Sequence, residues 1–288
     1  MLSLPQNPQA EGRGVVTILF WNLSKNSNAL IHLPCLAQTH SVDVFILAEC
    51  PKDLKPVITD LNDLGIGTYR EEVKAEPKVR ALTRLATKEF IHRFTSLGKE
   101  MAVWTVRAPR LNPPETLIAG LHLPSKHGGM NEASQASFAA KIIEELSRLE
   151  DERKHRNTVI VGDFNMHPYD PGMTSVDAFH GLMTKTLAEK TDRHYKGRKY
   201  RRFYNPMWSL LGDRTPGPAG SHYWRSSVPH NTHWQMFDQV LIRPSFIDHF
   251  DDLHILGHDG NHSLMGKDDA PDKKHLSDHL PVLFRLDI

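Results

Sequence analysis

Short runs of aliphatic, β-branched and aromatic residues recur along the whole chain and predict buried β-strands. They occupy residues 15–21, 44–48, 101–106, 116–123, 158–161, 237–242 and 281–286. Polar turns and amphipathic segments separate these runs. The hydrophobic pattern therefore predicts many short strands rather than a helical bundle.

The clearest amphipathic helix is expected at residues 132–153, with weaker helical patterns at 30–39 and 51–64. We assign its apolar stripe to core packing; the stripe consists of Phe138, Ile142, Leu146 and Leu149. Several strands follow one another between residues 78 and 123 without a helix, so antiparallel pairing must occur beside any βαβ unit. The pattern predicts a mixed α/β fold with two packed sheets and outer helices.

Composition supports one domain, because no shift in composition and no repeat divides the 288 residues. We expect a flexible polar segment at residues 1–14 and a single catalytic domain at residues 15–288. The N-terminal segment lacks the features of a signal peptide, and no apolar run approaches the roughly 20 residues that span a bilayer. With only Cys35 and Cys50 as cysteines, a cytoplasmic protein is expected.

Charge changes this picture little, because 35 Lys and Arg residues balance 34 Asp and Glu residues. Attraction to a polyanion would have to come from local clusters of basic residues.

Polar residues that can bind metals or transfer protons follow six of the apolar segments. A single Asp or Asn after a strand is commonly a turn former, yet these segment ends together supply three Asp, one Glu, two Asn and two His. In residues 162–165, Asp163 and Asn165 are two apart, so an extended backbone aims both side chains the same way. The eight residues are Asn22, Glu49, His122, Asp163, Asn165, Asp238, Asp278 and His279.

These residue types suit hydrolysis of a phosphodiester. The reaction needs a cation to neutralise the phosphate, a carboxylate to orient and deprotonate water, and donors for the phosphoryl oxygens. Carboxylate and amide oxygens favour Mg²⁺ or Mn²⁺. The lack of clustered cysteines argues against a structural zinc site, while a histidine-rich zinc site remains an alternative.

The order of the motifs resembles that of the endonuclease/exonuclease/phosphatase (deoxyribonuclease I-like) superfamily. The matching segments are Trp21-Asn22, Leu47-Ala48-Glu49, Leu121-His122, Gly162-Asp163-Phe164-Asn165, Phe237-Asp238 and Ser277-Asp278-His279-Leu280-Pro281-Val282. The resemblance implies a four-layer α/β sandwich, in which helices flank two mixed β-sheets. It also implies a phosphodiesterase that depends on Mg²⁺ or Mn²⁺.

The resemblance further implies roles for individual residues. Glu49, helped by Asn22, would bind the catalytic metal, and Asp163 would orient the attacking water. Asn165 would hold the phosphate or that water.

On the other side of the site, Asp238 would fix the tautomer of His279, which would donate to the scissile phosphate. His122 would be a phosphate ligand or the general acid for the leaving oxygen. Asp278 would join a metal site, and the number of metals stays open.

The sequence departs from the pattern of the superfamily in two places. The acidic partner expected for His122 has three candidates, namely Glu71, Glu72 and Glu76. The usual Gly before the third core strand is missing from residues 78–84. The resemblance therefore does not assign the adjoining substrate loop.

A basic segment with interleaved aromatic residues lies between Asp163 and Asp238 and indicates nucleic-acid contact. The substrate-binding candidates are Lys196, Arg198, Lys199, Tyr200, Arg201, Arg202 and Tyr204, together with Arg84. A solvated basic loop whose aromatic residues pack on the sandwich would explain the same pattern.

We therefore expect a nuclease with DNA or RNA as its partner. The first alternative is a phosphoesterase that acts on a lipid head group or an inositol phosphate. The second is an inactive nucleic-acid-binding module on the same fold.

The expected metal dependence is directly testable. Hydrolysis should stop in excess EDTA and return with added Mg²⁺ or Mn²⁺, because Glu49 and Asn22 supply too few hard oxygen ligands to retain the ion against a chelator. Rates measured before and after chelation check this, and full activity in EDTA would contradict it.

Overall fold

The computed structural model describes residues 14–72, 78–126, 129–190, 192–227, 229 and 231–288. Of the segment expected to be flexible, only Gly14 belongs to the described residues, and Glu76 lies outside them. No helix in these ranges is long and apolar enough to cross a membrane.

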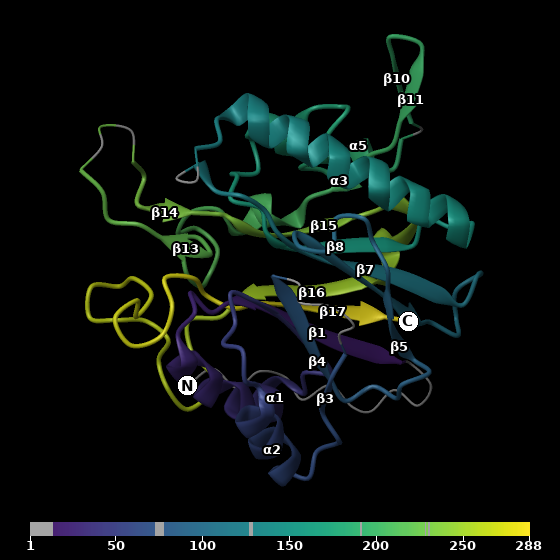
Figure 1. The fold of residues 1–288 in the computed structure, drawn as a ribbon. Coiled ribbons are helices and arrows are strands. Elements are labelled where there is room, and N and C mark those ends of the chain that lie inside the picture. Colours follow the sequence, from purple (N-terminus) through teal and green to yellow (C-terminus); the bar gives the residue numbers. More distant parts are fainter. Residues whose placement is uncertain (1–13, 73–77, 127–128, 191, 228, 230) are drawn as a thin grey trace.

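The strands form two mixed sheets that pack face to face (Figure 1). The six-stranded sheet has the order β16 (Phe250–Ile255), β17 (Val282–Asp287), β1 (Val15–Asn22), β2 (Val44–Ala48), β4 (Val79–Thr83) and β3 (Arg70–Glu71). The seven-stranded sheet has the order β5 (Phe90–Arg93), β6 (Met101–Arg107), β7 (Glu115–His122), β8 (Thr158–Asp163), β15 (Asp238–Ile242), β12 (Phe203–Tyr204) and β9 (Gly181–Leu182).

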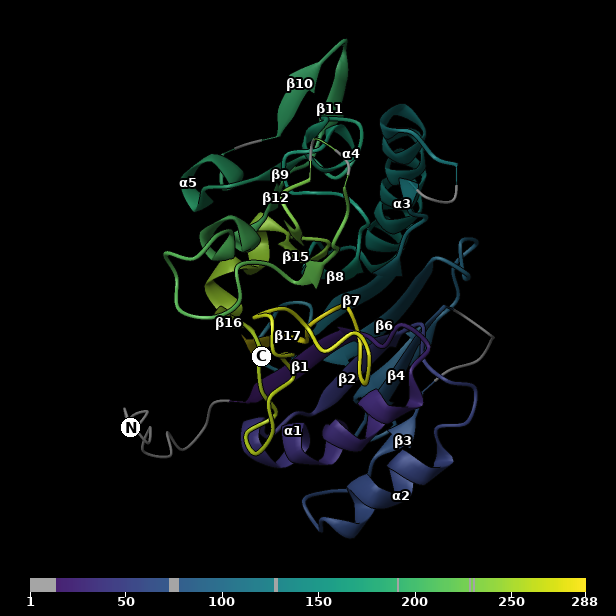
Figure 2. The ribbon, with the colours of Figure 1, turned by 90° about the vertical axis from the view of Figure 1, so that its left-hand side faces the viewer.

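Helices cover the outer faces of the two sheets (Figures 1 and 2). The long helix α3 (Glu132–Arg153) lies on the seven-stranded sheet, and the helices η1 (Ser27–His32), α1 (Leu33–His40) and α2 (Lys55–Asp63) lie on the other side. The order helix, sheet, sheet, helix confirms the predicted four-layer α/β sandwich.

Shorter elements lie around the seven-stranded sheet. They are α4 (Pro171–Thr174), α5 (Lys185–Ala188), η3 (Pro206–Leu210), η4 (Pro244–His249) and the hairpins β10 (Arg193–Tyr195) with β11 (Arg198–Tyr200) and β13 (His222–Tyr223) with β14 (Trp234–Gln235).

The hydrophobic pattern located the elements well. All seven predicted strands are present, and their ends move by at most two residues. The helix expected at residues 30–39 starts as the 3₁₀ helix η1, which continues into α1. Pro34 lies in the first turn of α1, where backbone N–H groups have no acceptor within the helix, so its missing N–H costs no hydrogen bond. The stripe on α3 packs on the sheet as expected, because Ile142, Leu146 and Leu149 share a buried cluster with β7 and β8.

Strand direction brings the predicted site residues to one edge of the sandwich. Strands β1 and β2 are parallel, as are β7 and β8, so Asn22, Glu49, His122 and Asp163 all lie at carboxyl ends. Strand β15 runs antiparallel to β8, which places its first residue, Asp238, opposite Asp163. Strand β17 is antiparallel to β1, so the segment before it, with Asp278 and His279, reaches the same edge.

Gly162 lets β7 and β8 approach each other next to this edge. A Cβ on Gly162 would overlap the carbonyl oxygen of Leu121 on β7, and it would lie 2.7 Å from the Leu121 nitrogen. Backbone atoms cannot rotate away, so a side chain here would push the strands apart.

The substitution Gly162→Ala should therefore lower the free energy of unfolding by about 1–3 kcal/mol, the usual cost of overpacking. Thermal or urea unfolding measures the effect. The control is Gly98→Ala, since a Cβ at Gly98 meets nothing closer than 3.5 Å. Equal stability of the two variants would show that the strands adjust without cost.

Candidate active site

The eight polar residues predicted at strand ends gather around one cavity of about 860 Å³. Seven of them line its wall, namely Asn22, Glu49, His122, Asp163, Asn165, Asp278 and His279. The eighth, Asp238, is fully buried behind His279. Residues from both sheets thus meet in one concave site.

Asp163 lies at the centre of the cluster and is itself almost fully buried. Its Oδ2 accepts a hydrogen bond from Asn22 Nδ2 at 2.9 Å, and its Oδ1 accepts one from the backbone N–H of Asn165 at 2.8 Å. The Nε2 atoms of His122 and His279 lie 3.8 and 3.9 Å from the same Oδ2. Asp163 is therefore held rigidly between two imidazoles.

Asn165 is positioned by its backbone as well as by its side chain. It has a left-handed φ of 51°, and its Nδ2 donates to the carbonyl oxygen of Leu123 at 2.9 Å. This bond anchors the segment after β8 to the segment after β7.

Glu49 has an unusual backbone conformation directly after β2. Its φ is 44°, a left-handed value that costs a non-glycine residue of order 1–3 kcal/mol. The backbone N–H of Lys25 donates to the Glu49 carbonyl oxygen at 2.9 Å and helps to hold this geometry. The side chain is 28 % exposed and reaches into the cavity.

Of the three candidate acidic partners of His122 from the sequence, Glu76 lies outside the described residues, and Glu71 and Glu72 do not contact His122. Glu71 is bound by Arg80 and Glu72 by Arg70, so both carboxylates are already engaged. His122 Nε2 instead lies 3.3 Å from Glu49 Oε1, and this contact holds the pKa of Glu49 below its usual value.

His279 and Asp238 form a buried pair. His279 Nδ1 lies 2.8 Å from Asp238 Oδ2, so the N–H at Nδ1 donates to the carboxylate and Nε2 faces the cavity. Burial alone would lower the pKa of His279, but the neighbouring carboxylates of Asp238 and Asp163 outweigh it and raise this pKa to about 9. At neutral pH the imidazole is a cation with a donor at Nε2.

The loop before β17 is tied to the end of β1. Ser277 Oγ donates to the carbonyl oxygen of Asn22 at 2.7 Å, and Trp21 Nε1 donates to the carbonyl oxygen of His279 at 2.9 Å. The position of His279 therefore depends on β1 as well as on Asp238.

Asp278 is surrounded by donors. Lys273 Nζ lies 2.8 Å away and His222 Nε2 lies 3.8 Å away, while Ser24 Oγ donates to Oδ1. Burial alone would raise the pKa of Asp278, but these contacts bring it well below its usual range. Asp278 is ionised at any physiological pH.

The cavity wall also contains residues that the sequence did not indicate, among them His222, Lys126, His167 and Lys273. His222 stacks on Phe237 with ring centroids 5.2 Å apart and lies 4.4 Å from the His279 ring. None of the four follows a long apolar run, so the strand-end pattern that found the other residues gives no signal for them.

The basic segment lies elsewhere. In Figure 1 the β10–β11 hairpin projects at the top right, whereas β13, which carries His222, lies on the left. None of the substrate-binding candidates lines the cavity, and this holds for Lys196, Arg198, Lys199, Tyr200, Arg201, Arg202, Tyr204 and Arg84. The structure therefore places these residues outside the cavity wall.

Local structure explains these positions. Tyr204 pairs with Ile242 near the edge of the seven-stranded sheet, and Arg202 donates to the carbonyl oxygen of Leu187 at 2.9 Å. Arg84 follows β4, which is antiparallel to β2, and binds Asp43 at 2.8 Å beyond the opposite end of the sheet. Contact of the exposed hairpin with a long substrate stays a prediction.

The donors around the cavity fit a hard divalent cation. Three of the carboxylates on its wall, those of Glu49, Asp163 and Asp278, belong to predicted site residues, as does the amide of Asn22. Oxygen donors of this kind suit Mg²⁺ or Mn²⁺. The same edge also contains two groups of possible metal ligands that share His279, one with His222 and Asp278 and one with Asp163 and Asp238.

No family model and no curated protein matches the sequence. Several solved structures match the chain in fold. An endonuclease/exonuclease/phosphatase family protein from Bacteroides thetaiotaomicron is 13% identical with a TM-score of 0.58, over 95% of this chain and 98% of that one. A mannosyl-6-phosphatase from the same species is 13% identical with a TM-score of 0.57, over 93% and 98%. D. rerio TDP2, complexed with a single-strand DNA product, is 12% identical with a TM-score of 0.52, over 95% and 99%.

This chain has the fold of the endonuclease/exonuclease/phosphatase (deoxyribonuclease I-like) superfamily, as the sequence motifs predicted. It is the fold of a superfamily of phosphoesterases.

The raised pKa of His279 leads to a prediction about pH. If the protonated imidazole is the active form, kcat/KM should fall as pH rises through the pKa of His279. Asp238→Asn removes a carboxylate that raises this pKa, so the alkaline fall should move to lower pH in the variant. A profile of kcat/KM against pH, measured for the wild type and for Asp238→Asn, shows the fall and its shift.

The matched control is Asp252→Asn. Asp252 also contacts a histidine, His254, at 2.7 Å, but on β16 and away from the cavity. This variant should keep the wild-type profile. An unchanged profile in Asp238→Asn would show that protonation of His279 does not control the alkaline fall in kcat/KM.

Proposed function

We propose that the chain is a divalent-metal-dependent phosphodiesterase, and that residues 15–288 act as one catalytic domain. The observation that carries the proposal is the position of Asp163. Its carboxylate lies among two imidazoles and an amide, at the wall of a cavity that also holds Glu49. This set combines a proton acceptor for water with donors for a phosphoryl group.

Asp163 is the residue that orients water and accepts its proton. Two hydrogen bonds, from Asn22 and from the Asn165 backbone, fix the direction of its carboxylate. A fixed acceptor needs no rearrangement as the water attacks, which is the basis of electrostatic preorganisation.

His279 donates its Nε2 proton to an oxygen of the scissile phosphate. The Asp238 carboxylate holds the ring in the required tautomer and keeps it charged. His122 lies on the other side of Asp163, where it binds the phosphate or protonates the leaving oxygen.

Glu49, helped by Asn22, would hold a Mg²⁺ or Mn²⁺ ion, and Asp278 would join it. A bound ion of this kind neutralises negative charge on the phosphate and on the leaving oxygen. The left-handed backbone at Glu49 supports a functional role for this residue, since strain of this kind concentrates at active sites.

The walls of the cavity favour nucleic acid as the substrate. Lys78, Lys126 and Lys273 supply cations for flanking phosphates, and Trp224 and Tyr169 add aromatic surface. Tyr169 stacks on His167 with ring centroids 5.0 Å apart and nearly parallel planes. Cations beside aromatic faces suit single-stranded nucleic acid, whose bases can stack. A fold neighbour, TDP2, is complexed with a single-strand DNA product.

A substrate panel tests the reaction. Purified protein with Mg²⁺ or Mn²⁺ should cleave labelled single-stranded DNA or RNA, and Asp163→Asn should lose at least about 10²-fold in turnover. Parallel reactions contain double-stranded DNA, a sugar phosphate, inositol phosphates and sphingomyelin. Faster cleavage of any of these would move the proposal to that substrate class. Binding of nucleic acid without hydrolysis of any substrate would indicate an inactive binding module.

The contribution of the cavity lysines can be measured separately. The pair Lys78→Gln and Lys126→Gln should raise KM for a single-stranded oligonucleotide. The slope of log K against log salt should fall by about 0.7 for each phosphate that the protein no longer neutralises. Cleavage of bis-p-nitrophenyl phosphate should change little, because this small diester has no flanking phosphates.

The matched control neutralises Lys196 and Arg198 on the β10–β11 hairpin. It removes the same charge at a distance from the cavity, so a short oligonucleotide should be cleaved as by the wild type. An equal rise in KM from the cavity substitutions and from the hairpin substitutions would show that the hairpin also contacts the substrate.

A further inference from the structure

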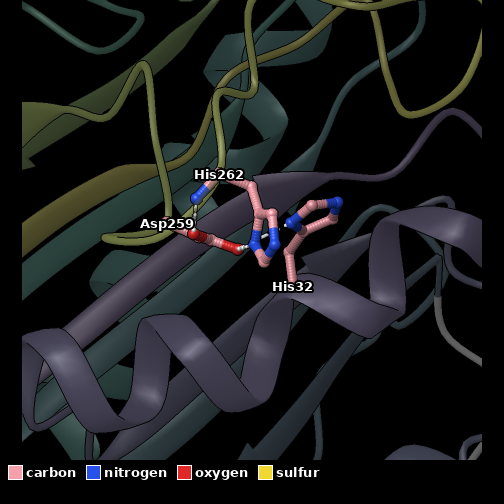
Figure 3. Close-up of side chains that lie close together, drawn as sticks. All are labelled: His32, Asp259 and His262. Atoms are coloured by element: carbon pink, nitrogen blue, oxygen red, sulfur yellow. Dashed lines mark hydrogen bonds and ion pairs between the residues drawn. The ribbon is translucent and has the colours of Figure 1, made fainter.

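A second cluster of possible metal ligands lies on the outer side of the six-stranded sheet, among residues that do not line the catalytic cavity. His32 ends the 3₁₀ helix η1, and Asp259 and His262 belong to the loop between β16 and β17. Figure 3 shows the three side chains turned toward one another.

The carboxylate of Asp259 is the centre of this cluster. His32 Nδ1 lies 2.7 Å and His262 Nδ1 lies 3.2 Å from the same oxygen, Oδ2. The other oxygen, Oδ1, accepts the backbone N–H groups of Asn261 and His262 at 2.7 and 2.6 Å. The loop backbone thus fixes the carboxylate so that Oδ2 faces the two imidazoles.

Among the described residues, Asp259 has no permanent counter-ion. Its side chain is 1 % exposed, and neither a lysine nor an arginine in the described part of the chain forms an ion pair with it. Buried carboxylates are usually paired with a cation or bound to a metal. The imidazoles give this carboxylate oxygen hydrogen-bond partners, and an ion bound by Oδ2 and the two Nδ1 atoms would in addition supply positive charge.

The loop is also held close to α1. Gly260 has a φ of 113°, and a Cβ on it would overlap the side chain of Thr39. Asn261 Nδ2 reaches Cys35 Sγ at 3.5 Å. Asp259 and His262 are therefore presented to His32 by packing that does not depend on the imidazoles.

We propose that His32, Asp259 and His262 form a second metal site, specific for an ion that prefers imidazole, with Zn²⁺ as the best fit. The ligand atoms lie within 4.8 Å of one another, which is close enough for one ion to bind all three. Two nitrogen ligands disfavour Mg²⁺ and Ca²⁺, which take oxygen ligands. His262 is 66 % exposed, so the fourth position is open to water.

The site would link the β16–β17 loop to η1. The same loop carries Lys273, Asp278 and His279 of the catalytic cavity, and the segment before η1 carries Ser24, which donates to Asp278. A metal bound here would restrain both segments and stabilise the folded state by mass action. Its role would be structural, because none of the three ligands lines the cavity.

The test measures metal binding rather than hydrolysis. The full chain is stripped with EDTA, dialysed and titrated with Co²⁺, whose visible absorption reports its ligands. Zn²⁺ then competes against a chromophoric chelator in excess Mg²⁺. His262→Ala should weaken binding at least about tenfold, since removal of a ligand should cost no less than the roughly 10–100-fold that follows removal of a group that only supports one.

The loop offers a closely matched control. His275 is 62 % exposed and lies 3.0 Å from Asp272, three residues earlier, as His262 does with Asp259, but among the described residues no second histidine completes a group there. His275→Ala should bind Co²⁺ and Zn²⁺ as the wild type does.

Binding at the catalytic edge is separated by His279→Ala, which breaks both groups of possible ligands there and should leave the second site intact. Zn²⁺ should raise the melting temperature of wild type, His275→Ala and His279→Ala, but not of His262→Ala. Equal affinity in wild type and His262→Ala would overturn the proposal, as would loss of all Zn²⁺ binding in a His279→Ala protein that still shows a cooperative thermal unfolding transition. Neither result depends on whether the chain is a phosphodiesterase.

Discussion

The buried bond between His279 and Asp238 is the interaction on which the site depends. Asp238 begins β15 in one sheet, and His279 lies just before β17 in the other. The carboxylates of Asp163, Asp238 and Asp278 all lie within 4.0 Å of the His279 ring nitrogens, and without a cation they would repel one another in a medium that screens charge poorly. The protonated imidazole relieves that repulsion, so a contact that joins the two sheets also supplies the cation that the proposed mechanism uses.

The rest of the geometry of the candidate site follows from how the two sheets end. Parallel strand pairs in each sheet present their carboxyl ends to the same edge, and short hydrogen bonds then fix the side chains that follow. The backbone strain at Glu49 persists because the neighbouring segment holds it in place. Recognition of a substrate is left to the loops around this rigid centre, which contribute the lysines and aromatic residues of the cavity wall.

The loop between β16 and β17 belongs both to the rigid centre of the site and to the surface around it. It carries residues of the proposed catalytic edge at one end and the Asp259 cluster at the other. Hydrogen bonds and buried side chains such as Leu264 and Leu276 hold it in place. A long loop is ordered only when its contacts outweigh its conformational entropy. The proposed metal would supply such a contact at the end of the loop far from the cavity.

The sequence by itself determined seven of the strands, the long helix and the eight polar residues at strand ends, but not strands such as β5 and β16. Apolar runs carry a local periodicity, and the fold then requires the ends of parallel strands to meet. Only the tertiary structure decided that Glu49 contacts His122, that His222 and Lys273 reach the cavity, and that the segment at residues 196–204 does not. Loops lack a periodic signal, and the direction in which each leaves the sheet depends on packing between residues far apart in the chain.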